Sequence, residues 1–176
     1  SLFQSGTSFV KLVADPNNKL PLITYWLMGS LSGANWRDLS FVVWPMAVGL
    51  IPLLLLRWRL NLLAMGDDEA RAMGVNANRL RLGIIVCATL VTAAAVSVSG
   101  MIGWVGLVIP HMMRRLVGSD YRWLLPASVL SGSVFLLVVD GISRNLAQGS
   151  VPIGILTAFI GAPFFLWLIM GKRGNV

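Results

Sequence analysis

Long apolar runs separated by short polar segments make up most of this chain, and one of them covers residues 39–56. These residues carry no charged side chain, and the run is close to the roughly 20 residues that a helix needs to cross a bilayer. Pro45 and Pro52 within it are expected to kink the helix. The pattern therefore predicts a membrane-spanning helix.

A second uncharged run covers residues 82–113 and is too long for one straight span. Arginines precede it and follow it, which is typical of a hairpin that returns to the side from which it started. Glycines are concentrated in residues 99–106, where we expect the chain to break. The run therefore predicts one span at residues 82–98 and a short one at residues 104–116.

The other apolar segments are shorter or less regular. Residues 123–139 and 151–170 are predicted spans. Residues 22–32 are too short to cross a bilayer alone, and they are either completed by their flanks or part of a broken helix. Residues 1–13 are interpreted as the tail of a span, and residues 33–38 as a polar turn. The expected fold is thus all-α, a polytopic membrane helix bundle.

Composition supports a membrane protein, since 56% of the residues are hydrophobic, 12% are charged and the mean hydropathy is +0.77. The net charge of +7 is explained by basic residues on the cytoplasmic side of a membrane rather than by nucleic-acid binding. Cys87 is the single cysteine and only one histidine is present, so no Cys/His metal cluster is expected. The chain lacks an initiator Met and a signal-peptide pattern, and we interpret it as a fragment.

One sizeable polar segment, residues 62–79, interrupts the apolar pattern. Asp67, Asp68 and Glu69 suit the positive end of a helix dipole, and Gly74 is a typical helix end. A helix of about two turns is therefore predicted between them. A short, capped helix between two membrane spans is a candidate docking element for another protein.

The distribution of basic residues assigns this polar segment to the cytoplasm. When the predicted spans alternate across the membrane with residues 62–79 inside, 12 of the 14 basic residues fall on the inner side, and Arg37 and Arg144 fall outside. The inner set is Lys11, Lys19, Arg57, Arg59, Arg71, Arg79, Arg81, Arg114, Arg115, Arg122, Lys172 and Arg173. An imbalance of this kind is what the positive-inside rule predicts.

Few polar residues in the apolar runs are candidates for chemistry. Asp140 is a possible proton relay, but Arg144 lies four residues later, at the spacing of an ion pair on one helix face. Arg144 is either an interface anchor for its helix end or a docking charge for an acidic partner. His111 is expected to have a structural or hydrogen-bonding role rather than a metal or proton role. The sequence shows no catalytic arrangement.

The sequence Gly66-Asp-Asp-Glu-Ala-Arg-Ala-Met-Gly74 resembles the cytoplasmic coupling segment of ABC importer permeases. It is most similar to that of the FecCD family, the permeases for iron–siderophores, haem, vitamin B12 and some oxyanions. Other segments match in the same order, namely Ala14-Asp-Pro-Asn-Asn-Lys-Leu-Pro21, Trp26-Leu-Met-Gly-Ser30, Gly103-Trp-Val-Gly-Leu-Val-Ile-Pro-His111 and Pro152-Ile-Gly-Ile-Leu-Thr-Ala-Phe-Ile-Gly-Ala-Pro163. Together they cover nearly the whole chain.

The resemblance implies a type II ABC importer permease fold, with ten membrane helices per subunit and a homodimer whose pore lies on the twofold axis. Residues 1–176 would form a partial permease domain of about six spans, from late in the fourth helix through the tenth. Residues 62–79 would be the coupling segment within it. ATP would be hydrolysed on separate ATPase subunits, so this chain is expected to be no enzyme and to bind no cofactor or metal.

The resemblance also assigns site residues. The implied ATPase-coupling residues are Gly66, Asp67, Asp68, Glu69, Ala70, Arg71, Ala72 and Gly74, with the two alanines letting the ATPase approach closely. The implied gate and pore residues are Asp15, Pro16, Asn17, Asn18, Tyr25, Trp26 and Gly29, the first four within an inner gate loop. Arg144 matches an outer arginine that pairs with a glutamate of the substrate-binding protein.

We therefore expect a permease subunit of a bacterial or archaeal plasma membrane that imports a metal chelate, with an iron–siderophore favoured. The expected partners are cytoplasmic ABC ATPases, a periplasmic or lipid-anchored substrate-binding protein, a second permease copy and membrane lipid, but no nucleic acid. The alternatives are import of vitamin B12, haem or molybdate, a proton-coupled carrier that uses Asp140, and a membrane scaffold without transport.

Overall fold

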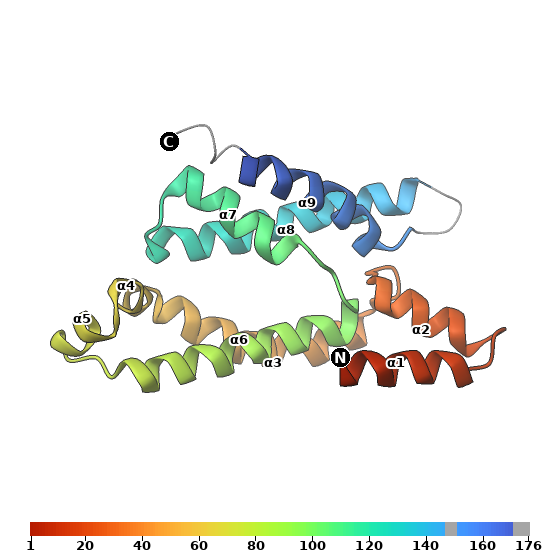
Figure 1. Ribbon diagram of the computed structural model, residues 1–176, viewed down its shortest axis with the longest axis horizontal. Coiled ribbons are helices and arrows are strands. Elements are labelled where there is room, and N and C mark those ends of the chain that lie inside the picture. The colour runs from red at the N-terminus through yellow and green to blue at the C-terminus, as the bar shows by residue number, and fades with distance from the viewer. Residues whose placement is uncertain (147–150, 171–176) are drawn as a thin grey trace.

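The computed structural model describes residues 1–146 and 151–170, with side chains through residue 166 in the last helix, and all regular structure in this part of the chain is helical (Figure 1). The helices are α1 (Leu2–Val13), α2 (Lys19–Met28), α3 (Trp36–Leu55), α4 (Arg57–Met65), α5 (Asp67–Ala72), α6 (Ala77–Ser99), α7 (Val105–Val117), α8 (Tyr121–Asn145) and α9 (Ile153–Met170). The predicted all-α fold is confirmed.

Three of the described helices, α3, α6 and α8, are long and apolar enough to cross a membrane, with 20, 23 and 25 residues. Helices α1, α2 and α7 have 12, 10 and 13 residues. At about 1.5 Å per residue, these shorter helices reach only about 15–20 Å, roughly half to two thirds of the hydrocarbon core. The predicted break of the long uncharged run is present, because α6 ends at Ser99 and α7 begins at Val105.

Helix α3 begins at Trp36, within the segment that the sequence predicts as a polar turn. The Asn35 side chain accepts hydrogen bonds from the backbone N–H groups of Arg37 and Asp38 at 3.0 and 3.1 Å. The Asp38 carboxylate accepts the Asn35 N–H at 3.3 Å in return. This reciprocal capping box starts the helix earlier than the apolar pattern indicates.

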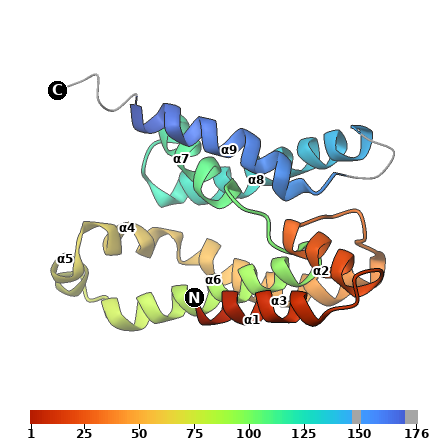
Figure 2. The same cartoon turned by 45° about the vertical axis from the view of Figure 1, so that its right-hand side comes forward.

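The helices form two layers (Figures 1 and 2), with α1, α2, α3 and α6 in one and α7, α8 and α9 in the other. Helices α3 and α6 run antiparallel and in close contact. A Cβ atom on Gly49 of α3 would lie 2.6 Å from Val91 Cγ2 and 2.8 Å from the Cys87 carbonyl oxygen of α6. The absence of a side chain at Gly49 thus permits the close contact, as small residues do between membrane helices.

Several turns lie at two opposite ends of the molecule, whereas the segment between α6 and α7 crosses from one layer to the other (Figures 1 and 2). Helices α4 and α5 lie at one end together with the turn between α7 and α8, whereas the turn between α1 and α2 and the end of α8 lie at the other (Figures 1 and 2). With α5 on the cytoplasmic side, as the sequence predicts, the turn between α1 and α2 is on the outer side.

This arrangement corrects one part of the predicted topology. Lys11 is in the last turn of α1 and Lys19 begins α2, so both flank the outer turn rather than lying on the inner side. The prediction failed because it treated residues 22–32 as part of a crossing. Helix α2 has only 10 residues and folds back beside α1, so the chain does not change sides there.

Candidate functional site

The predicted docking element is helix α5, and a glycine lies on each side of it. Gly66 precedes it with φ +133°, and Gly74 follows it with φ +77°. Both values lie in a region that residues with a Cβ atom rarely adopt. Asp67, Asp68 and Glu69 form the first turn, where negative charge is favourable. The helix predicted between the acidic residues and Gly74 is confirmed.

The chain leaves α5 through a complete Schellman motif. The Gly74 N–H donates to the Arg71 carbonyl at 2.9 Å, and the Val75 N–H donates to the Ala70 carbonyl at 2.9 Å. The Val75 side chain packs against the cluster that contains Ala70, which is the hydrophobic contact usual for this motif. A defined end of this kind gives a helix of only six residues a fixed shape.

A small apolar cluster holds α5 against its own chain. Leu62 of α4, Ala70 of α5 and Ala77 of α6 are 5%, 0% and 1% exposed. Ala70 therefore faces the interior of the segment, and the expectation that it lets a partner approach is wrong. Ala72 is exposed. The physical reason is helical spacing, because Ala70 and Ala72 lie on different faces of one turn.

The outward surface of α5 is charged. Asp68, Glu69 and Arg71 are exposed, and the Asp68–Arg71 pair at 3.9 Å is too open to restrain either side chain strongly. Asp67 instead binds Arg81 of α6, with 2.6 Å between Oδ1 and Nη2. The segment can therefore present carboxylates and a guanidinium to a polar groove on another protein while its inner face stays packed.

Two polar residues that the sequence did not single out join α4, which leads into this segment, to the start of α8. The Asn61 Nδ2 group donates to Asp120 Oδ1 at 2.6 Å, and Asn61 Oδ1 accepts the backbone N–H of Tyr121 at 2.9 Å. The role of Asp120 as a helix cap could have been predicted from the sequence, because an Asp directly before an apolar run is a typical helix N-cap. Nothing in the local pattern around Asn61 indicates its partner.

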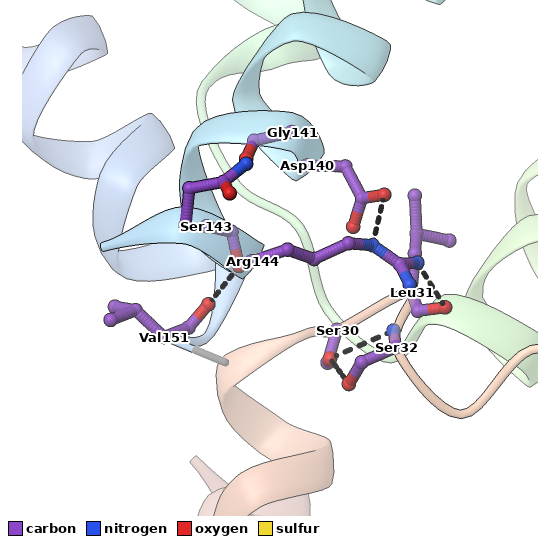
Figure 3. A network of polar contacts seen from close by, with 9 residues as sticks. Ser30, Leu31, Ser32, Asp140, Gly141, Ser143, Arg144 and Val151 are labelled. Atoms are coloured by element: carbon purple, nitrogen blue, oxygen red, sulfur yellow. Dashed lines mark hydrogen bonds and ion pairs between the residues drawn. The ribbon is translucent and has the colours of Figure 1, made fainter. Parts of the chain in front are cut away.

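Arg144 lies near the outer end of α8 and makes two polar contacts (Figure 3). Its Nε group donates to Asp140 Oδ2 at 2.8 Å, and its Nη2 group donates to the Leu31 carbonyl at 3.4 Å. The Arg144 side chain is 51% exposed and that of Asp140 is 17% exposed. The predicted ion pair at i,i+4 spacing is confirmed, and about half of the Arg144 side-chain surface remains exposed.

The four predicted gate residues, Asp15, Pro16, Asn17 and Asn18, lie together in the exposed turn between α1 and α2. Asp15 accepts hydrogen bonds from the Asn17 N–H at 3.1 Å and from Asn18 Nδ2 at 3.2 Å. These local bonds shape the turn. Because the turn lies at the end of the molecule opposite α5 (Figures 1 and 2), the prediction that it shares the inner side with the coupling segment is wrong.

The three predicted pore residues belong to α2 and its end. Tyr25 and Trp26 are 37% and 48% exposed, and Trp26 lines an apolar hollow of about 830 Å³ between α1 and α2. Gly29 ends the helix with φ +74°, and a Cβ there would lie 2.6 Å from the Met101 carbonyl oxygen. Gly29 thus lies at a close backbone contact with the segment after α6, and its N–H donates to the Trp26 carbonyl at 3.1 Å.

In the part of the chain that the structure describes, no three His, Cys, Asp or Glu side chains are grouped to hold a metal ion. His111 lies within α7 and is partly buried.

Comparison with known proteins identifies relatives along the whole chain. A family model described as the FecCD transport family matches residues 1–171. The molybdate import system permease protein MolB of Haemophilus influenzae is 44% identical over 176 residues, which are 99% of this chain and 52% of that protein. A probable iron chelatin transport system permease protein of Helicobacter pylori is 44% identical over 156 residues, 89% of this chain and 48% of that protein.

A solved structure has the same fold. It is described as an inward-facing conformation of a putative metal-chelate type ABC transporter, and it matches with a TM-score of 0.91 and 44% identity over 97% of this chain and 55% of that one. The chain spans about half the length of the curated relatives that it matches.

Proposed function

The chain belongs to the FecCD transport family, and on that premise we propose that it is part of the membrane-spanning subunit of an ATP-driven importer. ATP is bound and hydrolysed on separate ABC ATPase subunits at the cytoplasmic end. A substrate-binding protein delivers the substrate at the outer end, and a second permease copy completes the pore. The subunit itself moves the substrate without covalent chemistry.

The observation that carries this proposal is the construction of α5. Its inner face is fixed by the buried Ala70 and by the Asp67–Arg81 ion pair, and its outer face presents Asp68, Glu69 and Arg71. A rigid, exposed and charged helix at the end of three apolar spans is suited to dock in a groove of a cytoplasmic ATPase. When the ATPases close, the docked helix moves with them, and rigid-body shifts of the attached spans change the side to which the pore opens.

The proposed substrate class is a metal chelate, with an iron–siderophore favoured and vitamin B12, haem or molybdate as alternatives. One relative is named for molybdate, another for iron chelatin and the solved relative for metal chelates. Uptake of radiolabelled iron–siderophore, competed with each of the other three substrates, tests the choice. Uptake of molybdate and of none of the other three substrates would exclude a metal chelate as the substrate.

The comparisons do not support a proton-coupled carrier based on Asp140, because the relatives described above are named as permease proteins of import or transport systems and the solved structure as an ABC transporter. The structure pairs the Asp140 carboxylate with Arg144 at 2.8 Å. A proton relay would need that carboxylate to exchange protons during transport.

The test of the coupling role uses Gly74, where a Cβ atom would have no heavy atom within 4 Å. Gly74→Ala adds only the backbone penalty of a left-handed conformation, about 1 kcal/mol, whereas Gly74→Arg also adds bulk and charge beside α5. In liposomes with the partner ATPase and binding protein, we expect Gly74→Arg to abolish substrate-stimulated ATP hydrolysis and uptake, and Gly74→Ala to reduce them only in part.

Gly83→Ala is the matched control, because Gly83 lies within α6 with ordinary helical backbone angles and has open space around it. It should behave as the wild-type protein. Unchanged ATP hydrolysis and uptake in Gly74→Arg would exclude a coupling role for α5.

A further inference from the structure

We propose that Asn61 and Asp120 form a clasp that fixes the coupling helices α4 and α5 to the start of α8, so that displacement of α5 by an ATPase is carried into α8. The inference rests on the proposed function and adds a route by which motion enters the membrane helices. Asn61 and Asp120 are positioning residues in this scheme, since neither contacts the substrate.

The clasp uses both halves of the Asn61 amide. The Nδ2 group donates to Asp120 Oδ1 at 2.6 Å, and the Oδ1 atom accepts the Tyr121 N–H at 2.9 Å. A side chain from α4 therefore binds the cap residue of α8 and one of the backbone N–H groups that the first turn of a helix leaves unpaired. The two partners are 59 residues apart in the sequence, so the contact is purely tertiary.

Asp120 is well suited to receive this bond. Its Oδ1 atom also accepts the Arg122 N–H at 2.8 Å as the N-cap of α8. That backbone hydrogen bond, followed by the hydrogen bond from Asn61, lowers the pKa of the Asp120 carboxyl below its ordinary value. The carboxylate is therefore ionised at neutral pH, and a hydrogen bond to an ionised acceptor is stronger than one between neutral groups.

A second set of contacts from α4 supports the same joint. Arg57 Nη1 donates to the Arg122 carbonyl at 3.1 Å, and the Arg122 guanidinium lies 6.0 Å from the ring centroid of Trp58. Arg57 and Asn61 are four residues apart and so lie on one face of α4. One face of α4 thus binds the first turn of α8 at several points.

The position of α8 makes this joint mechanically useful. With 25 residues, the helix extends about 37 Å, from the end that carries α4 and α5 to the outer end that carries Arg144 (Figure 1). The Asp67–Arg81 pair ties α5 to α6, but both of its side chains are substantially exposed, at 40% and 50%. The clasp gives the segment a separate connection to the helix that reaches the outer surface.

The experiment exchanges the two groups of the clasp. Asn61→Asp places a carboxylate against the Asp120 carboxylate and removes the donor, whereas Asp120→Asn keeps both an acceptor and a good helix cap. The double variant Asn61→Asp/Asp120→Asn interchanges carboxylate and amide and restores a charge-assisted hydrogen bond. Each variant is made in the full-length permease, assembled with its ATPase and binding protein in liposomes.

The readout is the number of substrate molecules imported per ATP hydrolysed. We expect Asn61→Asp to lower this ratio by about threefold or more while ATP hydrolysis continues. Asp120→Asn should have a smaller effect, and the double variant should recover most of the wild-type ratio. A wild-type ratio in Asn61→Asp, or a double variant no better than Asn61→Asp, would overturn the clasp.

Two further measurements, assembly of the transporter and amide hydrogen exchange, test the proposal if a variant is unstable. If Asn61→Asp fails to assemble and the double variant assembles, the rescue supports pairing of the two groups. If both fail and Asp120→Asn assembles, pairing is refuted. In assembled transporters, the hydrogen-exchange rate of the α5 amides should rise in Asn61→Asp and should return to the wild-type rate in the double variant. Absence of ATP-dependent uptake in the wild-type transporter would instead refute the proposed function.

Discussion

The guanidinium group of Arg144 reaches the carbonyl oxygen of Leu31 at 3.4 Å, although the two residues are 113 positions apart in the sequence. Leu31 lies in the segment that follows α2, and the Ser30 N–H next to it donates to the Ser99 carbonyl at the end of α6 at 2.8 Å. The outer end of α8 thus contacts the segment after α2 (Figure 3), and that segment is hydrogen-bonded to the end of α6.

The first prediction concerns docking of the binding protein at Arg144. Arg144→Glu places a second carboxylate beside Asp140 and repels an acidic partner. We expect affinity for the binding protein to fall at least about tenfold, or 1.4 kcal/mol, at low ionic strength, and less at high salt because counterions screen exposed charges. Surface plasmon resonance on the permease in nanodiscs measures both conditions.

Arg37→Glu is the matched control for this prediction, because Arg37 is the other basic residue that the sequence assigns to the outer side, and the change in charge is the same. It should weaken docking much less. Equal affinity of wild type and Arg144→Glu at both ionic strengths would remove Arg144 from the docking surface.

The second prediction separates an ATP-driven importer from a proton-coupled carrier. Asp140 is 17% exposed and paired with Arg144, so it has a structural role in the outer contact. We expect ATP-driven uptake into liposomes to continue in Asp140→Asn, and to be insensitive to an ionophore that collapses the pH gradient. Uptake that follows the pH gradient and disappears in Asp140→Asn would support the carrier instead.

The third prediction tests the contact between α2 and α9. A Cβ on Gly154 would overlap the Met28 carbonyl oxygen, a backbone atom that cannot move aside as a side chain can. We expect Gly154→Ala to destabilise the protein by about 1–3 kcal/mol, the usual cost of overpacking. Thermal unfolding in detergent measures the change.

Gly141→Ala is the control for Gly154→Ala, because Gly141 lies inside α8 with no neighbour within 4 Å of a Cβ. Alanine there should be neutral or stabilising, since it favours the helix more than glycine does. A melting temperature that is equal in the two variants would contradict the close contact.

The fourth prediction concerns acid stability. The pKa of Asp120 is lowered below its ordinary value of 3.8, first by the Arg122 N–H and then by Asn61. A carboxyl with a lowered folded-state pKa contributes stability above its unfolded pKa, and this stability is lost as the pH falls through the folded value. Wild type should therefore exceed Asp120→Asn in melting temperature at neutral pH, and the difference should shrink below pH 3.8.

All other carboxylates are common to the two proteins, so the comparison isolates Asp120. A difference in melting temperature that stays constant with pH would show that the carboxylate charge does not contribute at this position.

The sequence predicted correctly those features that depend on residues close to one another along the chain. The sequence by itself determined the three long apolar spans, the chain break before α7 and the short helix before Gly74. It also placed Asp140 and Arg144 within reach of each other. Each of these follows from residues within a few positions, because helix periodicity, glycine backbone freedom and i,i+4 spacing act over one or two turns.

Only the tertiary structure decided the features that depend on where separate helices pack. It placed the turn between α1 and α2 on the side opposite α5, because α2 is too short to cross a membrane and folds back. It buried Ala70 against Leu62 and Ala77. It also joined Asn61 to Asp120 across 59 residues, because α4 folds onto the start of α8, and no local sequence pattern specifies which distant helix an amide will meet.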